Sequence, residues 1–203
     1  MLKADFKIMN VAHIPLFYPY LKKTRSQNKN KKIKIVFIGS FNHTPNTDAV
    51  NFLCKEIYPK IKNKISIYII GPFEKKIQHL KNNNIHILGK VENLDVILKK
   101  MDLAISPLRY GAGTKGKLLT YATYNLPVIC SKISVEGTLF RHKKHCYIPV
   151  AEEPEIYAKE IIKLYKNKKL SSQISKNLNS LFLEKYSFQH GFKLLDKNKK
   201  IKF

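Results

Sequence analysis

The chain has 203 residues, of which 44% are hydrophobic, and a formal net charge of +24; these values fit one globular domain and exclude a disordered chain. No apolar run reaches the roughly 18–20 residues of a membrane span, and the N-terminus shows no secretory signal. The three cysteines lack the spacing of a disulfide framework or a zinc site, so we expect reduced thiols in a cytoplasmic protein.

The positive charge comes almost entirely from lysine, because only three of the 38 basic residues are arginine. The lysines are spread along the chain and do not gather on one motif with interleaved aromatic residues, so we expect no nucleic-acid partner. A field of this sign attracts anionic surfaces, and peripheral contact with the inner face of a membrane is one expectation that follows.

The chain divides into three predicted parts: a lead-in and linker at 1–32, a domain at 33–190 and a basic tail at 191–203. Within the domain, short β-branched runs alternate with stretches of helical periodicity. In chain order the predicted elements are strand 33–38, helix 46–61, strand 66–70, helix 74–81, strand 85–89, helix 94–101, strand 103–106, helix 117–124, strand 127–130, strand 146–150, helix 154–166 and helix 171–185.

This alternation predicts an α/β fold, an open parallel sheet of about six strands with helices on both faces. The predicted strands are nearly continuous apolar runs, as expected when both faces of the sheet are covered. In such sheets, ligands bind beyond the carboxyl ends of the strands. The loops that follow the strands are therefore the candidate site, and they span 39–46, 71–74, 89–94, 107–117 and 131–137.

The loop at 106–117 combines several features that favour an anion. Its glycines let the backbone approach a ligand closely, and the free N–H groups of the following helix favour negative charge. Arg109, Lys115 and Lys117 add positive charge. The loop predicts a site for a phosphate or diphosphate; the alternative is a glycine-rich surface turn with solvated lysines.

Other signals are weaker. Residues 111–117 match the beginning of a P-loop, but Leu118 stands where that motif needs Ser or Thr for magnesium, so we predict no ATPase or GTPase. The seven histidines show no metal or triad spacing, and no metal site is predicted. Glu136 follows the fifth predicted strand on the ligand side, where its carboxylate either accepts hydrogen bonds from sugar hydroxyls or has only a structural role.

An ordered series of motifs resembles the C-terminal domain of glycosyltransferase family 4, the group 1 glycosyltransferases. The strongest match is the run Ser-Pro-Leu-Arg-Tyr-Gly-Ala-Gly-Thr-Lys-Gly-Lys at 106–117. The resemblance extends over about residues 33–190. Its other segments lie at 36–41, 45–50, 69–71, 88–94, 126–129, 136–137 and 184–188.

The resemblance implies one Rossmann-like half of a GT-B architecture, which binds a nucleotide-diphosphate sugar as donor substrate without a cofactor or metal. Gly39 would let the first loop approach the donor phosphates, and Val91 and Leu94 would lie beside the base. Arg109 and Lys117 would add positive charge near the leaving diphosphate. The residues implied to meet the sugar and diphosphate are Gly111, Gly113, Thr114 and Lys115.

The chain also departs from the family pattern. Thr120 stands where the family usually has a ribose-binding glutamate, and it offers one hydrogen bond instead of two. No N-terminal acceptor domain is evident in residues 1–32. Three functions therefore stay open: a donor-binding domain that transfers a sugar to a glycan or lipid-linked acceptor with a separately encoded acceptor domain, a degenerate non-catalytic nucleotide-binding module, and a basic protein that binds anionic surfaces.

Overall fold

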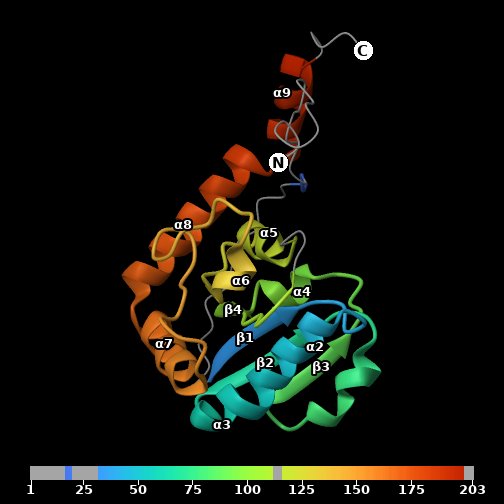
Figure 1. The fold of residues 1–203 in the computed structure, drawn as a ribbon, viewed down its shortest axis with the longest axis vertical. Coiled ribbons are helices and arrows are strands. Elements are labelled where there is room, and N and C mark those ends of the chain that lie inside the picture. Colours follow the sequence, from blue (N-terminus) through green and yellow to red (C-terminus); the bar gives the residue numbers. More distant parts are fainter. Residues whose placement is uncertain (1–16, 20–31, 112–115, 199–203) are drawn as a thin grey trace, which may run out of the picture.

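The computed structural model describes residues 17–19, 32–111 and 116–198 (Figure 1). At its centre is a five-stranded parallel sheet with the order β3-β2-β1-β4-β5. β1 pairs with β2 from Ile33 against Ile65 to Ile38 against Ile70. The strands are β1 (Ile33–Ile38), β2 (Ile65–Ile70), β3 (Ile85–Gly89), β4 (Leu103–Ser106) and β5 (Val128–Cys130).

The predicted fold class is confirmed, but the sixth strand predicted at 146–150 is wrong. Tyr147 makes only an isolated parallel bridge to Ile129, in which the Tyr147 N–H donates to Val128 O. The next residues cannot extend this pairing, because Pro149 has no N–H and Val150 is 81% exposed. A run of apolar, β-branched residues was therefore not enough to make a strand here.

One face of the sheet is covered by a continuous helical stretch and by α7 (Pro154–Lys166). The stretch replaces the predicted helix 46–61 and passes through a π-helical segment just before Pro59. Pro59 has no N–H to donate to the carbonyl four residues earlier, which accounts for irregular winding at this point. The stretch consists of α2 (Thr44–Asn51), η1 (Phe52–Ile57) and α3 (Tyr58–Ile61).

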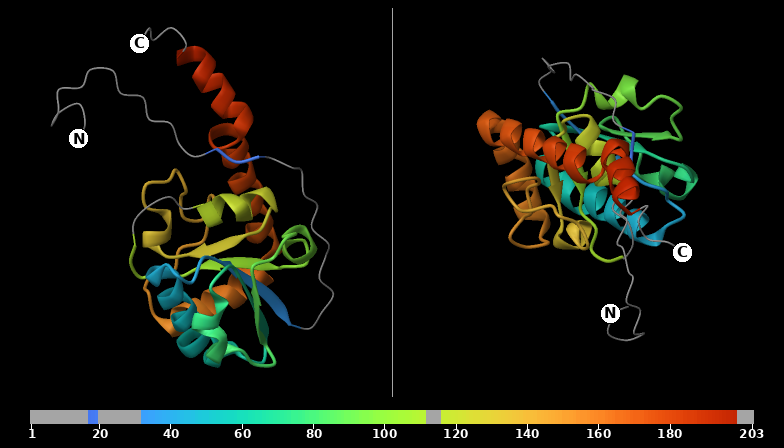
Figure 2. Two further views of the ribbon diagram at one scale, coloured as in Figure 1. Left: turned by 90° about the vertical axis from the view of Figure 1, so that its right-hand side faces the viewer. Right: turned by 90° about the horizontal axis from the view of Figure 1, so that it is seen from above.

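The other face packs mainly against α5 (Gly116–Thr123) and α8 (Lys168–Lys185), with α4 (Asp95–Leu98) at one side (Figure 2). Side chains of β1 alternate between the two layers: Ile35 and Phe37 join one apolar cluster, and Val36 joins the other. This two-sided burial is why the strands are apolar at almost every position. It also fixes both helical layers against the faces of the sheet.

Three short or terminal helices complete the described part. η2 (Glu74–Leu80) is a 3-10 helix where a helix at 74–81 was predicted. α6 (Lys132–Val135), which was not predicted, begins at Ser131, whose hydroxyl accepts from the Ser134 N–H. α9 (Phe188–Asn198) was not predicted either, and it contains the boundary expected at residue 190. None of the described helices combines the length and apolar character needed to cross a membrane.

Residues 17–19 of the predicted lead-in lie against the junction of α8 and α9. The Tyr18 N–H donates to Tyr186 O at 2.9 Å, and Tyr18 O accepts from the Phe188 N–H at 3.2 Å. A Cβ atom added to Gly191 would lie 2.6 Å from the Phe17 ring, so helix and segment are in close contact. Residues 17–19 of the predicted linker are therefore packed against the domain.

Candidate functional site

The loops after β1 and β2 approach each other very closely at the carboxyl edge of the sheet. A Cβ atom on Gly71, whose φ is +143°, would lie 1.8 Å from Gly39 O. Gly39 itself faces Asn46, because a Cβ atom on Gly39 would lie 2.8 Å from Asn46 Cγ. The space predicted to let a donor phosphate approach Gly39 is therefore filled, on this side, by the Asn46 side chain.

Asn46 connects the first loop to Lys117. Its amide Nδ2 donates to Ser40 O at 2.9 Å, and its Oδ1 accepts from Lys117 Nζ at 2.5 Å. The ammonium group also lies 4.3 Å from the centre of the Phe37 ring, a cation–π geometry. Asn46 is only 8% exposed, so the Lys117 ammonium is held at a defined place at the edge of the sheet.

The first turns of two helices meet at this contact. Asn46 lies in the first turn of α2, and Lys117 in the first turn of α5. The first turn of α5 carries N–H groups without partners inside its own helix, whereas in α2 Pro45 has no N–H and the Asn46 and Thr47 N–H groups donate to His43 O. The dipole of each helix places partial positive charge at its first turn. Neither first turn contains an acidic residue. The arrangement therefore favours an anion over a cation.

A buried tyrosine fixes α5 against the strands. The Tyr121 hydroxyl accepts from the Ile38 N–H at 2.8 Å and donates to Ile105 O at 3.5 Å, which joins the ends of β1 and β4. Tyr121 is fully buried, and this burial raises the pKa of its phenol. The hydroxyl thus stays neutral and keeps its proton for donation, so α5 has a fixed position relative to β1.

The loop between β4 and α5 is described only in part. Gly111 has a φ of +117°, and a Cβ atom there would lie 2.9 Å from Pro45 Cγ, so a larger residue would collide with the start of α2. Gly111 therefore has a packing role, and the ligand role expected for it stays a prediction. The predicted residues Gly113, Thr114 and Lys115 lie outside the described residues.

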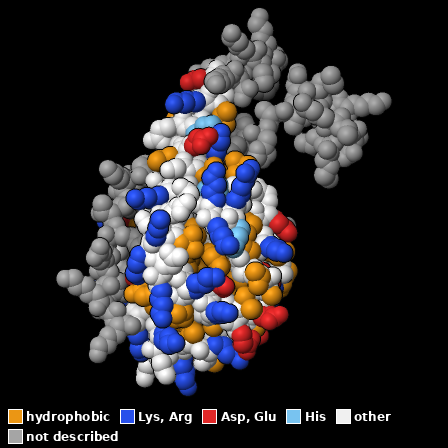
Figure 3. Space-filling view, turned by 90° about the vertical axis from the view of Figure 1, so that its left-hand side faces the viewer, with side chains coloured by type: hydrophobic (Ala, Val, Ile, Leu, Met, Phe, Trp, Pro, Cys, Tyr) orange, Lys and Arg blue, Asp and Glu red, His pale blue; other side chains and the backbone are white. Residues whose placement is uncertain are grey.

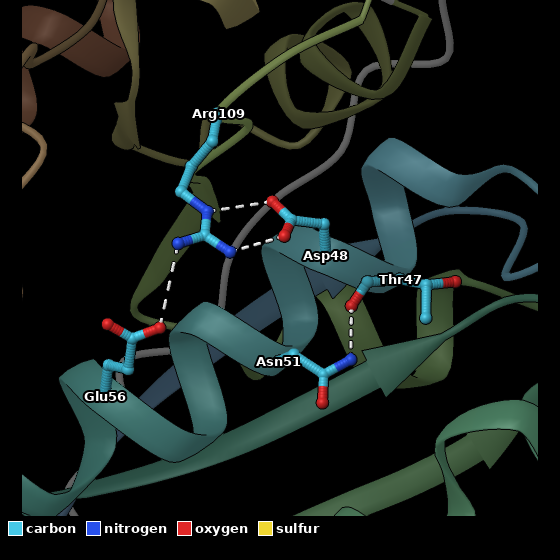
Figure 4. A network of polar contacts seen from close by, with 5 residues as sticks. All are labelled: Thr47, Asp48, Asn51, Glu56 and Arg109. Atoms are coloured by element: carbon cyan, nitrogen blue, oxygen red, sulfur yellow. Dashed lines mark hydrogen bonds and ion pairs between the residues drawn. The ribbon is translucent and has the colours of Figure 1, made fainter.

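Arg109 is engaged by acidic side chains of the helical stretch (Figure 4). Its Nε donates to Asp48 Oδ2 at 2.9 Å, and its Nη2 pairs with Asp48 Oδ1. Glu56 Oε1 lies 3.8 Å from Nη1, and the guanidinium carbon lies 5.0 Å from the centre of the Phe52 ring. The Asp48 hydrogen bonds raise the pKa of Arg109 further. The Arg109 charge is therefore shared with two carboxylates, and its contact with a diphosphate stays a prediction.

The residues predicted to contact the base and the ribose belong to the segment before α4 and to α5. Val91 and Leu94 precede α4 and are partly buried against the apolar cluster that contains α5. The Thr120 hydroxyl donates to Gly116 O at 3.3 Å, within α5 itself. Its oxygen can still accept a hydrogen bond from a ligand.

Glu136 follows α6 and is exposed. Its position is set by a buried hydroxyl cluster: Ser134 Oγ lies 3.0 Å from Ser106 Oγ and 2.9 Å from Ser131 Oγ. These three serines join the ends of β4 and β5 to α6. The structure thus brings Glu136 to the carboxyl edge of the sheet, as its place in the sequence predicted.

The structure also shows residues that the sequence analysis did not single out. Asn46, Asp48 and Tyr121 organise the site, and each acts through a partner at least 61 positions away. A tyrosine on the apolar side of a predicted helix was the one available signal, since a buried hydroxyl needs a partner. Within the described part of the chain, no three His, Cys, Asp or Glu side chains are grouped as a metal site.

Comparisons with known proteins concern the family and the fold of the chain. The family model described as Glycosyl transferases group 1 matches residues 32–167. An uncharacterized 44.6 kDa protein in the cps region of Klebsiella pneumoniae is 25% identical over 195 residues, which cover 89% of this chain and 49% of that protein. The chain thus spans about half the length of this curated relative.

Two solved structures share the fold. A variant of S. aureus TarM in complex with Fondaparinux, alpha-GlcNAc-glycerol and UDP has a TM-score of 0.73 at 17% identity, over 96% of this chain and 40% of that one. The C-terminal domain of a glycosyl transferase group 1 family protein (LpcC) from Francisella tularensis has a TM-score of 0.61 at 15% identity. That match covers 83% of this chain and 97% of the domain.

Proposed function

The chain belongs to the group 1 glycosyltransferases, and from this premise we propose that it binds a nucleotide-diphosphate sugar and takes part in transferring the sugar to a glycan or lipid-linked acceptor. The donor is a substrate, and no resident cofactor takes part in the proposed chemistry. A single observation carries the proposal: the first turns of α2 and α5 meet at the carboxyl edge of the sheet, with the Lys117 ammonium held between Asn46 and Phe37.

This arrangement fits the electrostatic demand of sugar transfer. The bond between the sugar carbon and the diphosphate oxygen breaks, a bond to an acceptor oxygen forms, and negative charge grows on the leaving diphosphate. A fixed ammonium and oriented N–H groups stabilise such charge without rearranging during the reaction. Lys117 and the first turn of α5 supply these groups, and Lys115 and Thr114 are proposed to add to them.

The remaining contacts are assigned by position. Val91 and Leu94, both partly buried, form an apolar edge for the base. Thr120, one turn along α5 from Gly116, is placed to make one hydrogen bond to the ribose. Glu136, exposed at the end of α6, is proposed to accept hydrogen bonds from sugar hydroxyls. Arg109 is not assigned to the leaving group, because Asp48 and Glu56 already engage it.

The acceptor is proposed to be bound by a separate domain. Because this chain covers 49% of its curated relative and 40% of the TarM structure, the relatives contain as much chain again beyond the matched part. Transfer requires donor and acceptor to be held together in one geometry. We therefore place the acceptor site on a further domain, encoded separately or in a longer chain.

Calorimetric titration with UDP, GDP and ADP at two salt concentrations tests donor binding. We expect saturable binding with a stoichiometry of one, with UDP preferred because UDP is bound in the TarM structure. Lys117→Ala should weaken binding at least about tenfold, the effect of losing one charge-assisted contact. Lys62→Ala, which removes an exposed lysine after α3, is the matched control.

Three outcomes separate the competing functions. Weak binding of all three nucleotides that disappears with salt and ignores Lys117→Ala would overturn the proposal and leave a basic protein that binds anionic surfaces. Selective binding without transfer, when an acceptor domain from a relative is added, would indicate a non-catalytic nucleotide-binding module. Urea unfolding of each variant confirms that lost binding does not come from lost folding.

A further inference from the structure

A groove of about 330 Å³ lies between the C-terminal half of α8 and the turn that follows α6. Figure 3 views the molecule from the side along which α7 and α8 run, and Lys and Arg side chains are spread over that whole face with few acidic ones. None of the residues assigned above to the nucleotide sugar lines this groove. It is therefore a second, separate feature of the surface.

The groove concentrates hydrogen-bond donors and positive charge. Arg141 and Lys144 come from the turn, and Lys185 comes from the end of α8. The single carboxylate in the lining, Glu184, is already paired with Lys185 Nζ at 2.8 Å, and this contact lowers the pKa of Glu184. No ion pair joins Arg141 or Lys144 to any residue that the structure describes.

His145 adds a further donor to the same groove. It is only 6% exposed, and its Nδ1 accepts from the Arg141 N–H at 3.1 Å. The proton of the neutral imidazole therefore sits on Nε2. This atom makes no hydrogen bond to the residues that the structure describes, and it is not fully buried. Burial, with Lys144 and Arg141 adjacent, lowers the pKa of His145.

The backbone fixes these groups relative to one another. Arg141 O accepts the Lys144 N–H at 3.2 Å and the His145 N–H at 2.9 Å, so the turn is closed. The turn is attached to the end of α8, because the Leu139 N–H donates to the Tyr186 hydroxyl at 3.2 Å. Asn177 and Ser180 complete the lining from α8 with further donors.

From this juxtaposition we propose that the groove binds a small phosphate group, held by Arg141 and Lys144 with the His145 Nε2–H as a further donor. A phosphate oxygen that carries charge accepts hydrogen bonds and does not donate them. It therefore matches the polar part of the lining, where the donors outnumber the single carboxylate. The site goes beyond the proposed donor site and does not depend on it. The group belongs either to a soluble phosphate ester or to the headgroup of an anionic lipid.

The first experiment follows the His145 ring by NMR while inorganic phosphate or glycerol 3-phosphate is added at constant ionic strength. We expect a saturable shift and a rise in the His145 pKa, because a bound anion offsets the neighbouring cations. Arg141→Ser with Lys144→Ser should weaken the apparent affinity at least about tenfold. His145→Asn assigns the signal.

The control removes the same charge elsewhere. Lys62→Ser with Lys75→Ser, both exposed and outside the groove, should leave the phosphate response unchanged. Lys117→Ala should also leave it unchanged, which separates this site from nucleotide binding. The absence of a saturable His145 response, or an equal loss in the control, would overturn the proposal.

A second experiment identifies the source of the phosphate. The full chain is sedimented with vesicles of phosphatidylglycerol or phosphatidylcholine. If the groove takes a lipid headgroup, Arg141→Ser with Lys144→Ser lowers binding to the anionic vesicles at least about fivefold more than the Lys62 and Lys75 control does. If both pairs lower vesicle binding equally while the His145 response persists, the ligand is a soluble ester.

Discussion

Lys117 Nζ donates a hydrogen bond to Asn46 Oδ1 at 2.5 Å, and this contact joins the first turns of two helices from opposite faces of the sheet. Asn46 in turn holds the Ser40 carbonyl of the first loop. One side chain thus fixes both the ammonium and the loop that borders the proposed diphosphate site.

A carboxylate in place of the Asn46 amide should compete with the donor phosphates for Lys117. We expect Asn46→Asp to weaken UDP binding about tenfold, because the ammonium then faces a carboxylate in place of a neutral amide. Calorimetry measures this change. Asn51→Asp adds the same charge to α2 at a side chain that bonds only Thr47 O, and it should change the affinity little. Equal losses in the two variants would mean that only net charge matters.

Arg109 should contribute to stability and not to nucleotide binding. Its side chain is 40% exposed and paired with Asp48, so solvent screening limits the pair to about 0.5–1 kcal/mol. Arg109→Gln should lower the free energy of unfolding by that amount and change the UDP affinity less than about twofold. An affinity loss as large as that of Lys117→Ala would show that Arg109 leaves Asp48 for the ligand.

The Tyr121 hydroxyl should be a structural anchor. Tyr121→Phe leaves the Ile38 N–H without its partner in a partly buried position, which costs about 1–3 kcal/mol. Urea unfolding measures the loss. Tyr110→Phe removes a hydroxyl from a side chain that is 47% exposed, and its stability should stay near that of the wild type. Similar values for both variants would contradict an anchoring role.

Gly71 should be far less tolerant of substitution than Gly137, although both have a positive φ. A Cβ atom on Gly71 would collide with Gly39 O, whereas nothing lies within 4 Å of one on Gly137. We expect Gly137→Ala to cost about 1 kcal/mol of backbone strain and Gly71→Ala several times more, measured by thermal unfolding. A comparable cost at both positions would show that the loops after β1 and β2, which meet at Gly39 and Gly71, separate easily.

Alkaline pH should destabilise the fold partly through Cys54. Its burial in η1 raises the pKa of the thiol to about 12 from a value of 9.0. Between these pH values the unfolded state has lost the proton and the folded state keeps it, so stability falls as pH rises. The contribution approaches about 1.4 kcal/mol per pH unit. Cys54→Ala should flatten the difference between pH 9 and pH 11 in urea unfolding.

The sequence by itself determined the fold class and the edge of the sheet that carries the site. Short, continuous apolar strands require cover on both faces, and parallel strands place their following loops together. Lys117 and Glu136 therefore reached the expected edge. The same reasoning failed at 146–150, where Pro149 and an exposed Val150 end the pairing that the apolar pattern favoured.

Only the tertiary structure decided which side chain each of these charges contacts. Arg109 and Lys117 look equivalent in the sequence, but Asp48 engages one and the neutral Asn46 holds the other. Such partners lie 61 and 71 positions away, and no local pattern encodes them. A side chain's partner depends on how the helices pack on the sheet. The sequence therefore predicts where a charged side chain lies but not which residue it contacts.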